Sequence, residues 1–132
     1  MITITQIISG IEIIFNIQLP LIYKDFLKSH WTFNKTYDLL VMIHFKSTLL
    51  CIDKLFNIVE FINILSYRNS YQEFIINEVV SIGTFLGSEG VCMGIGQANF
   101  GKIYYVESDL YDFVEIAPDF ESFISLLNLP QC

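Results

Sequence analysis

The sequence is short of charged residues, and its charges are unevenly distributed. Charged residues make up 16% of the 132 residues and apolar residues 53%, whereas roughly a quarter of an average globular domain is charged. Residues 1–77 carry six acids and six bases. Residues 78–132 carry eight acids and one base, Lys102, and supply the whole net charge of −7. Because nucleic-acid phosphates are bound by clustered Lys and Arg, this pattern argues against a nucleic-acid ligand.

The same composition bears on other partners. A high apolar content favours contact with a protein partner or with a second copy of the chain, that is, a homo-oligomer. The acidic second half would suit a basic partner. The alternative is a solvated acidic face that only keeps the domain soluble.

Long apolar runs and paired cysteines are also lacking. No uncharged apolar run reaches the roughly 18–20 residues of a membrane-spanning helix, and the first basic residue, Lys24, comes too late for the basic start of a secretory signal. The three cysteines, Cys51, Cys92 and Cys132, are odd in number and widely spaced. We interpret them as reduced thiols, which predicts a cytoplasmic location. The short apolar runs predict that the protein has no membrane span.

Familiar catalytic and metal-binding patterns are missing too. The chain contains no H-E-x-x-H, C-x-x-C or G-x-S-x-G motif. His30 and His44 lie among apolar and aromatic neighbours, and no nucleophile, base and orienting group fall together. Glu107, Asp109 and Asp112 lack the glycine and distal Glu of a calcium loop. We therefore predict no enzymatic activity, no cofactor and no metal site.

One stretch, GQANFGKI at residues 96–103, has almost the spacing of a phosphate-binding loop. Such a loop leads into a helix, whose N-terminus supplies amides and positive dipole. Here Ile103 occupies the position that needs Ser or Thr, and the strand-prone residues Tyr104 and Tyr105 follow. The stretch is therefore predicted to be a hairpin turn that binds no nucleotide.

Hydrophobic periodicity predicts a single α+β domain over residues 1–132, with a mostly antiparallel sheet packed against N-terminal and C-terminal helices. Apolar residues have helical spacing at residues 4–15, where Thr3 or Thr5 is a possible N-cap, and again after Pro20. Two further helices are predicted at residues 55–65 and 120–127, and Asp119 is the expected N-cap of the last one. Strands are predicted at residues 39–45, 47–53, 74–85, 90–96 and 102–107, and residues 109–117 are predicted to form a turn followed by a strand.

Several of these stretches resemble the SUKH superfamily, which includes the fungal cell-wall-assembly and glucan-synthesis regulators. Leu19, Pro20, Tyr23, Phe26 and Leu27 match its entry motif, Leu-Pro-x-x-Tyr-x-x-Phe-Leu. Tyr23, Phe26 and Leu27 have helical spacing and are predicted to form the inner, core-facing side of the second helix. SIGTFLGSEGVCMGIG, GKIYYVESD and IAPDFESFISLL are similar to its later segments in the same order. The chain departs from the family in KSHWTFNKT, which has no glycine where many members have one.

The resemblance implies a protein-binding role. Many members are immunity proteins that neutralise a bacterial toxin, often a nuclease; the alternatives are a scaffold or regulator like the fungal members and, last, a small-ligand binder or enzyme. Residues 107–121 contain six acids and no base, with aromatic residues between them. The residues expected to bind the partner, a basic toxin domain, are Tyr105, Glu107, Asp109, Tyr111, Asp112 and Glu115. In the alternative interpretation, the aromatic residues face the core and the acids only face solvent.

Overall fold

The computed structural model describes residues 2–29, 37–45, 48–85, 90–107 and 112–126, with the backbone alone for 37–45, 48–50 and 107. Within this part of the chain the helices are α1 (Ile4–Ile14), α2 (Leu21–Ser29), α3 (Ile58–Ser66), α4 (Gln72–Ile76) and α5 (Phe120–Leu126), with a 3-10 turn, η1 (Arg68–Ser70). The strands are β1 (Tyr37–Phe45), β2 (Thr48–Leu55), β3 (Val79–Phe85), β4 (Gly90–Gly94), β5 (Ile103–Glu107) and β6 (Asp112–Ala117).

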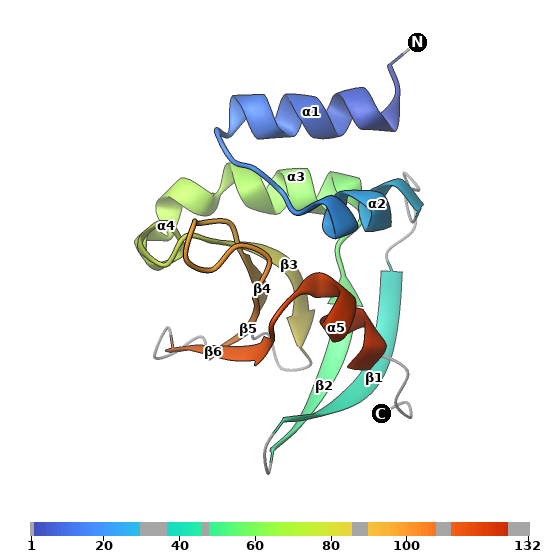
Figure 1. The fold of residues 1–132 in the computed structure, drawn as a ribbon, viewed down its shortest axis with the longest axis vertical. Coiled ribbons are helices and arrows are strands. Elements are labelled where there is room, and N and C mark those ends of the chain that lie inside the picture. The colour runs from blue at the N-terminus through green and yellow to red at the C-terminus, as the bar shows by residue number, and fades with distance from the viewer. Residues whose placement is uncertain (1, 30–36, 46–47, 86–89, 108–111, 127–132) are drawn as a thin grey trace.

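The strands form one sheet in the order β1-β2-β3-β4-β5-β6, and every neighbouring pair is antiparallel (Figure 1). Each strand therefore pairs with its neighbour in the sequence. The predicted α+β architecture with an antiparallel sheet is confirmed. The strand predicted at residues 39–45 is present as β1, at one edge of the sheet.

Three of the described helices, α1, α3 and α5, begin at a polar residue whose side chain caps them. Thr3 accepts a hydrogen bond from the amide of Gln6, whose side chain bonds back to Thr3, so that α1 starts with a capping box. Asn57 and Glu60 do the same for α3. Asp119 accepts from the amide of Ser122 at 2.7 Å at the start of α5, as its sequence position predicted.

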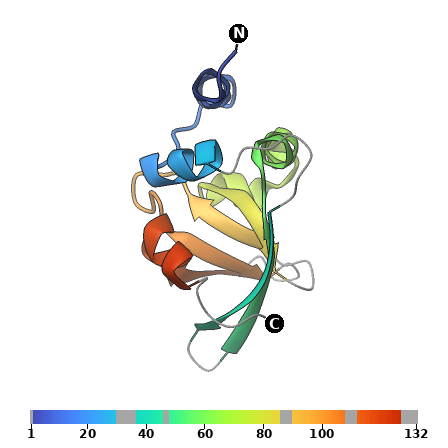
Figure 2. The same cartoon turned by 90° about the vertical axis from the view of Figure 1, so that its right-hand side faces the viewer.

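The main core lies between the helices and one face of the sheet, and Figure 2 shows α1 end-on as the outermost helix. Its aromatic centre joins α2 to α5 and α3. The Tyr23 ring meets the rings of Phe120 and Phe61 edge-on, with centroids 5.1 and 5.6 Å apart. Tyr23 and Leu27 are each 1% exposed, which confirms them as the inner face of α2. Phe26 is half-buried, and its ring meets that of Phe120 edge-on, with centroids 5.2 Å apart.

The opposite face of the sheet carries a smaller cluster. Because side chains alternate along a strand, Val79, Cys92 and Val106 point away from the main core, and they pack with Phe74, Tyr104 and Phe113. Phe74 comes from α4, which therefore covers part of this second face. The sheet is thus apolar on both faces at its centre.

The predicted strand at residues 74–85 is too long at its start. Phe74 to Ile76 belong to α4, and Glu78 has a φ of 53° that turns the chain before β3 begins at Val79. The Arg68 guanidinium explains this turn, since it donates to the carbonyls of Phe74, at 3.3 Å, and Val79, at 2.8 Å. That tertiary contact overrides the β-branched composition of the stretch.

The cysteines differ from expectation. Cys92 is a free and fully buried thiol, whereas Cys51 is disulfide-bonded, so the interpretation of all three as reduced thiols is wrong for Cys51. Spacing along the sequence does not reveal which thiols the fold brings together. Cys132 lies outside the described residues. No described helix combines the length and apolar character needed to cross a membrane.

Candidate functional site

The loop at residues 95–102 has the geometry of a hairpin and not of a phosphate site. β5 follows it, with no helix in between. The Gly101 amide donates to the Gly94 carbonyl at 2.9 Å, and the Gly96 amide donates to the Asn99 side chain at 2.8 Å. These amides are thus already bonded within the loop. Gly101 adopts a φ of 83°, the left-handed conformation that favours glycine.

The register of the sheet places the residues that were predicted to bind a partner on different faces. Tyr105 is half-buried and points to the main core, where its ring meets that of Phe85 at 5.0 Å. Glu115 pairs with Tyr104 in the register of β5 and β6, on the second face of the sheet. Asp112 is exposed at the start of β6. Of the other predicted residues, Asp109, Tyr111 and the Glu107 side chain lie outside the described part.

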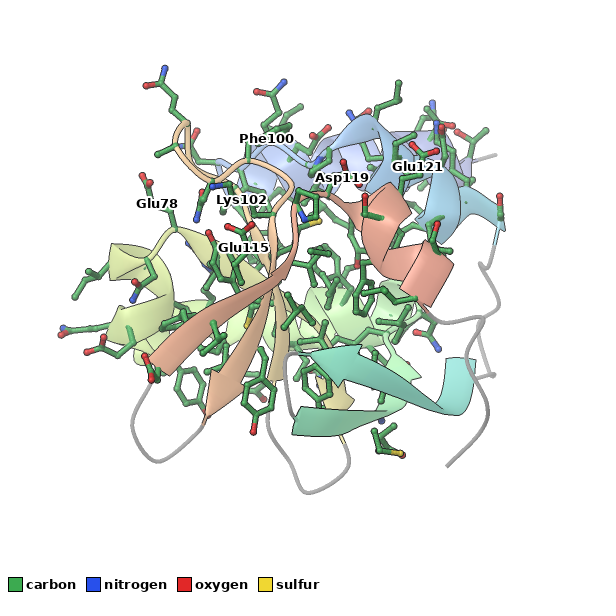
Figure 3. All side chains as sticks on the ribbon, turned by 60° about the horizontal axis from the view of Figure 1, so that its bottom comes forward. Glu78, Phe100, Lys102, Glu115, Asp119 and Glu121 are labelled. Atoms are coloured by element: carbon green, nitrogen blue, oxygen red, sulfur yellow. The ribbon has the colours of Figure 1, made fainter. Side chains whose placement is uncertain are left out.

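Four exposed acids follow one another along β6 and the start of α5: Asp112, Glu115, Asp119 and Glu121. Glu78, just before β3, is exposed as well. Figure 3 shows Glu115 beside Lys102, with Asp119 and Glu121 further along at α5. We call the four residues on β6 and α5 the acidic row. The sequence has six acids at residues 107–121, and the four whose side chains the structure describes lie on β6, the last strand of the sheet, and at the start of α5.

Two members of the acidic row already have partners within the chain. The Glu115 Oε1 and Lys102 Nζ atoms form an ion pair at 3.4 Å, and the two side chains are 44% and 41% exposed. Such exposed pairs contribute at most about 1 kcal/mol. Hydrogen bonds from the backbone and side chain of Ser122 lower the pKa of Asp119, which keeps this carboxylate charged. Asp112 and Glu121 have no ion-pair partner among the described residues.

Sequence reasoning missed a cavity of about 400 Å³ between the α3–α4 segment and strands β3 to β5. Its wall contains Tyr67, Arg68, Tyr71 and Phe74. Among the described lining residues, Arg68 is the one with a charge. Burial lowers the pKa of Arg68, and the charge of Glu78 opposes this shift. The available signal was the spacing of the three aromatic residues, which matches one side of a helical segment.

Within the described residues, no three His, Cys, Asp or Glu side chains come together in a way that could hold a metal ion. The ionisable groups with the largest pKa shifts are Tyr23 and Cys92, and burial raises both pKa values. Both groups lie inside packed clusters. They are therefore structural residues and not a nucleophile with its base.

Comparison with known proteins agrees with this fold and with the sequence motifs. The model of the SMI1 / KNR4 family (SUKH-1) matches residues 5–126. The match runs from α1 to the last described residue of α5 and includes the helical entry motif, the hairpin and the terminal helix. No curated protein matches the chain. The chain therefore belongs to the SMI1 / KNR4 family (SUKH-1).

Proposed function

We propose that this chain is a non-enzymatic protein-binding domain and, more specifically, an immunity protein that neutralises a bacterial toxin. Family membership supports a protein-binding role. The observation that carries the proposal is the acidic row, because its exposed carboxylates lie in a half of the chain that has a single base. A toxin domain with a basic surface, such as a nuclease, has the complementary charge.

Charge would act mainly on the rate of association. Exposed carboxylates create a field that steers a basic partner toward this edge, and salt screens that field beyond a Debye length of about 8–10 Å. Asp112 and Glu121 are the members best placed to contribute. Glu115 is partly neutralised by Lys102, and Asp119 caps α5.

A cytoplasmic location is part of the proposal, because a toxin that attacks nucleic acid is neutralised where it acts. Thiol content no longer favours this location, since Cys51 is disulfide-bonded and disulfides are rare in the cytosol. The location therefore depends on the toxin hypothesis alone. Detection of the protein in fractionated cells tests it directly.

The test is charge reversal in a toxin-rescue assay. Asp112→Lys and Glu121→Lys are made singly and together. Asp25→Lys, on the exposed side of α2, is the control for the single variants, because it makes the same change in charge as each of them. Cells expressing the toxin encoded beside the gene are scored for survival, and association rates with the purified toxin domain are measured at low and high salt. The double variant should associate about tenfold more slowly at low salt, and the difference should shrink at high salt.

The control distinguishes local from overall charge. Asp25→Lys should slow association less than either single variant, because Asp25 lies on α2 and is not a member of the acidic row, although α2 packs against α5. Unchanged, salt-independent association in the double variant would place the interface elsewhere and leave the acidic row as a solubilising surface. A gene without a neighbouring toxin gene would favour the scaffold or regulator role instead.

A further inference from the structure

The outer side of α1 carries the most exposed large apolar side chains of the described residues. Ile13 and Ile14 are 79% and 77% exposed, and Ile2, just before the N-cap, is 74% exposed. Ile8 and Ile11 bury the opposite side of the helix in the main core. Figures 1 and 2 place α1 at one end of the molecule, with α2 between it and α5. In a single chain this outer side therefore faces water.

The helix lacks the charges with which a surface helix normally meets water. Residues 1–23 contain one charged side chain, that of Glu12. Its carboxylate accepts a hydrogen bond from the Leu19 amide at 2.8 Å and lies 3.6 Å from the Lys24 Nζ atom, so it is already paired within the chain. A helix that is apolar on nearly all sides is normally buried. This composition indicates that α1 is covered by a partner.

Gly10 lies on the same side as the exposed isoleucines. Ile13 and Ile14 follow it by three and four residues, which are neighbouring positions on a helix surface. A Cβ atom at Gly10 would meet nothing within 4 Å, so packing within the chain does not require a glycine there, although glycine weakens a helix relative to alanine. A glycine on a helix surface does allow a second helix to approach closely. Gly10 and Ile13 thus form a hollow beside a projection.

The distribution of charge decides which partner fits this surface. A basic toxin domain is attracted to the acidic row, and the single acid of residues 1–23 is already paired. A membrane surface favours Lys or Arg beside the apolar residues, and residues 1–23 contain neither. A second copy of the chain meets neither objection, because two uncharged apolar sides match each other and homodimer interfaces are the more apolar kind. The acidic rows of both copies would lie beyond α2, so that like charges stay apart.

We propose that two copies of this chain form a dimer through the outer sides of their α1 helices. Around a two-fold axis near Gly10, Ile13 of each copy packs over Gly10 of the other, and Ile2 and Ile14 extend the contact. Each helix of 11 residues is about 17 Å long, so the pair buries less than the roughly 1,200–2,000 Å² of a standard interface. A reversible dimer with a Kd of about 10–100 µM is therefore expected.

Two substitutions and one control test this contact. Ile13→Glu places two like charges in the apolar contact, one from each copy, while Glu is a better helix former than Ile. Gly10→Leu fills the hollow that receives the isoleucine, and Leu also favours a helix over Gly. Ile76→Glu is the matched control, because Ile76 on α4 is 70% exposed. Thermal melting well below the expected Kd should show that no variant is less stable than the wild type, so that an effect on the dimer is not an effect on the fold.

Sedimentation equilibrium of the full chain, from well below to well above the expected Kd, measures the oligomeric state. The wild type should dimerise reversibly. Ile13→Glu and Gly10→Leu should each raise the Kd by about tenfold or more, and Ile76→Glu should leave it unchanged. Added salt should not weaken the dimer, because it screens only the repulsion between two acidic copies. A chain that stays monomeric, an unchanged Kd in either α1 variant, an equal effect of the control, or a dimer that dissociates in salt would each overturn the inference.

A mixed sample of methyl-labelled and unlabelled chains locates the contact by NMR. Contacts between copies should join the Ile13 methyl groups of one chain to the Gly10 α protons of the other, and contacts confined to other elements would refute the proposed interface. Vesicles of phosphatidylcholine and phosphatidylserine, and the neighbouring toxin domain, test the other two occupants. Binding of either one that Ile13→Glu abolishes would assign this side of α1 to that partner and overturn the dimer. If the toxin binds neither protein while the wild type dimerises, the immunity function fails and the dimer stands.

Discussion

Replacing Tyr23 by Phe should stabilise the protein, although Tyr23 lies at the centre of the core. Its ring is 1% exposed and packs against Phe61 and Phe120. Its hydroxyl has no hydrogen-bond partner among the described residues. A buried hydroxyl without a partner costs about 1–3 kcal/mol in protein mutational data. Removing only the oxygen leaves the ring contacts in place.

We expect Tyr23→Phe to raise the free energy of unfolding by about 1–2 kcal/mol, because the small hollow left by the oxygen offsets part of the gain. For a chain of this size, each kcal/mol moves the melting temperature by about 3–5 °C. Urea unfolding and calorimetry measure both quantities. Tyr67→Phe is the matched control, since its hydroxyl belongs to a residue that is 59% exposed, and it should change stability by less than about 0.5 kcal/mol.

The same substitution should flatten the loss of stability in alkali. Burial raises the pKa of Tyr23 in the folded state. The stability that depends on a protonated Tyr23 is therefore fully present below the unfolded-state pKa of about 10 and is lost as the pH rises above that value. The unfolded chain releases the proton there and the folded chain keeps it, which costs about 1.4 kcal/mol per pH unit. The Tyr23→Phe variant has no hydroxyl at this position, so its free energy of unfolding should not fall with pH for this reason. A variant destabilised by more than 1 kcal/mol at neutral pH would refute the reasoning and show that the hydroxyl is hydrogen-bonded.

Three further predictions concern single residues. Gly94→Ala should cost about 1–3 kcal/mol in urea unfolding, because the added Cβ would overlap the Asn99 carbonyl; a neutral result would mean that the hairpin loop rearranges freely. Cys92 should resist thiol reagents in the native protein, since burial raises its pKa, and in denaturant without reductant mass spectrometry should find label on Cys92 and none on Cys51. Asp119→Asn should lower the melting temperature at pH 7 and have no effect near pH 2, because a carboxyl group whose pKa is lowered by folding stabilises the fold only above its folded-state pKa; a difference that does not depend on pH would show that the charge of Asp119 does not stabilise α5.

Local signals in the sequence predicted the two ends of the fold well. Thr3 and Asp119 are polar residues before apolar periodic runs, and a cap depends only on residues within one turn. The hairpin at residues 95–102 was recognisable because glycines and strand-prone flanks determine a turn locally. The family motif placed Tyr23 and Leu27 in the core correctly, since it is largely a packing motif.

Contacts between distant residues could not be predicted in the same way. Arg68 fixes the turn before β3 by bonding Phe74 and Val79, and nothing in the sequence marks it as a partner of either carbonyl. The sequence also did not show which strand residues face which side, because bulges shift the register between Ile103 and Tyr104. The partner-binding role of the predicted residues stays a prediction: the fold turns Tyr105 inward and exposes Asp112 and Glu115.

The sequential strand order has a consequence for how the chain folds. Every strand pair joins neighbours in the sequence. Four of the five pairs close a short loop at low entropic cost and can form early, whereas β2 and β3 are separated by α3, η1 and α4. The ring contact between Tyr23 and Phe120 spans most of the chain, and its loop is among the most expensive to close. We expect the sheet to assemble first and α5 to dock last. During synthesis, then, the aromatic centre stays open to chaperones and proteases until residues 120–123 have left the ribosome.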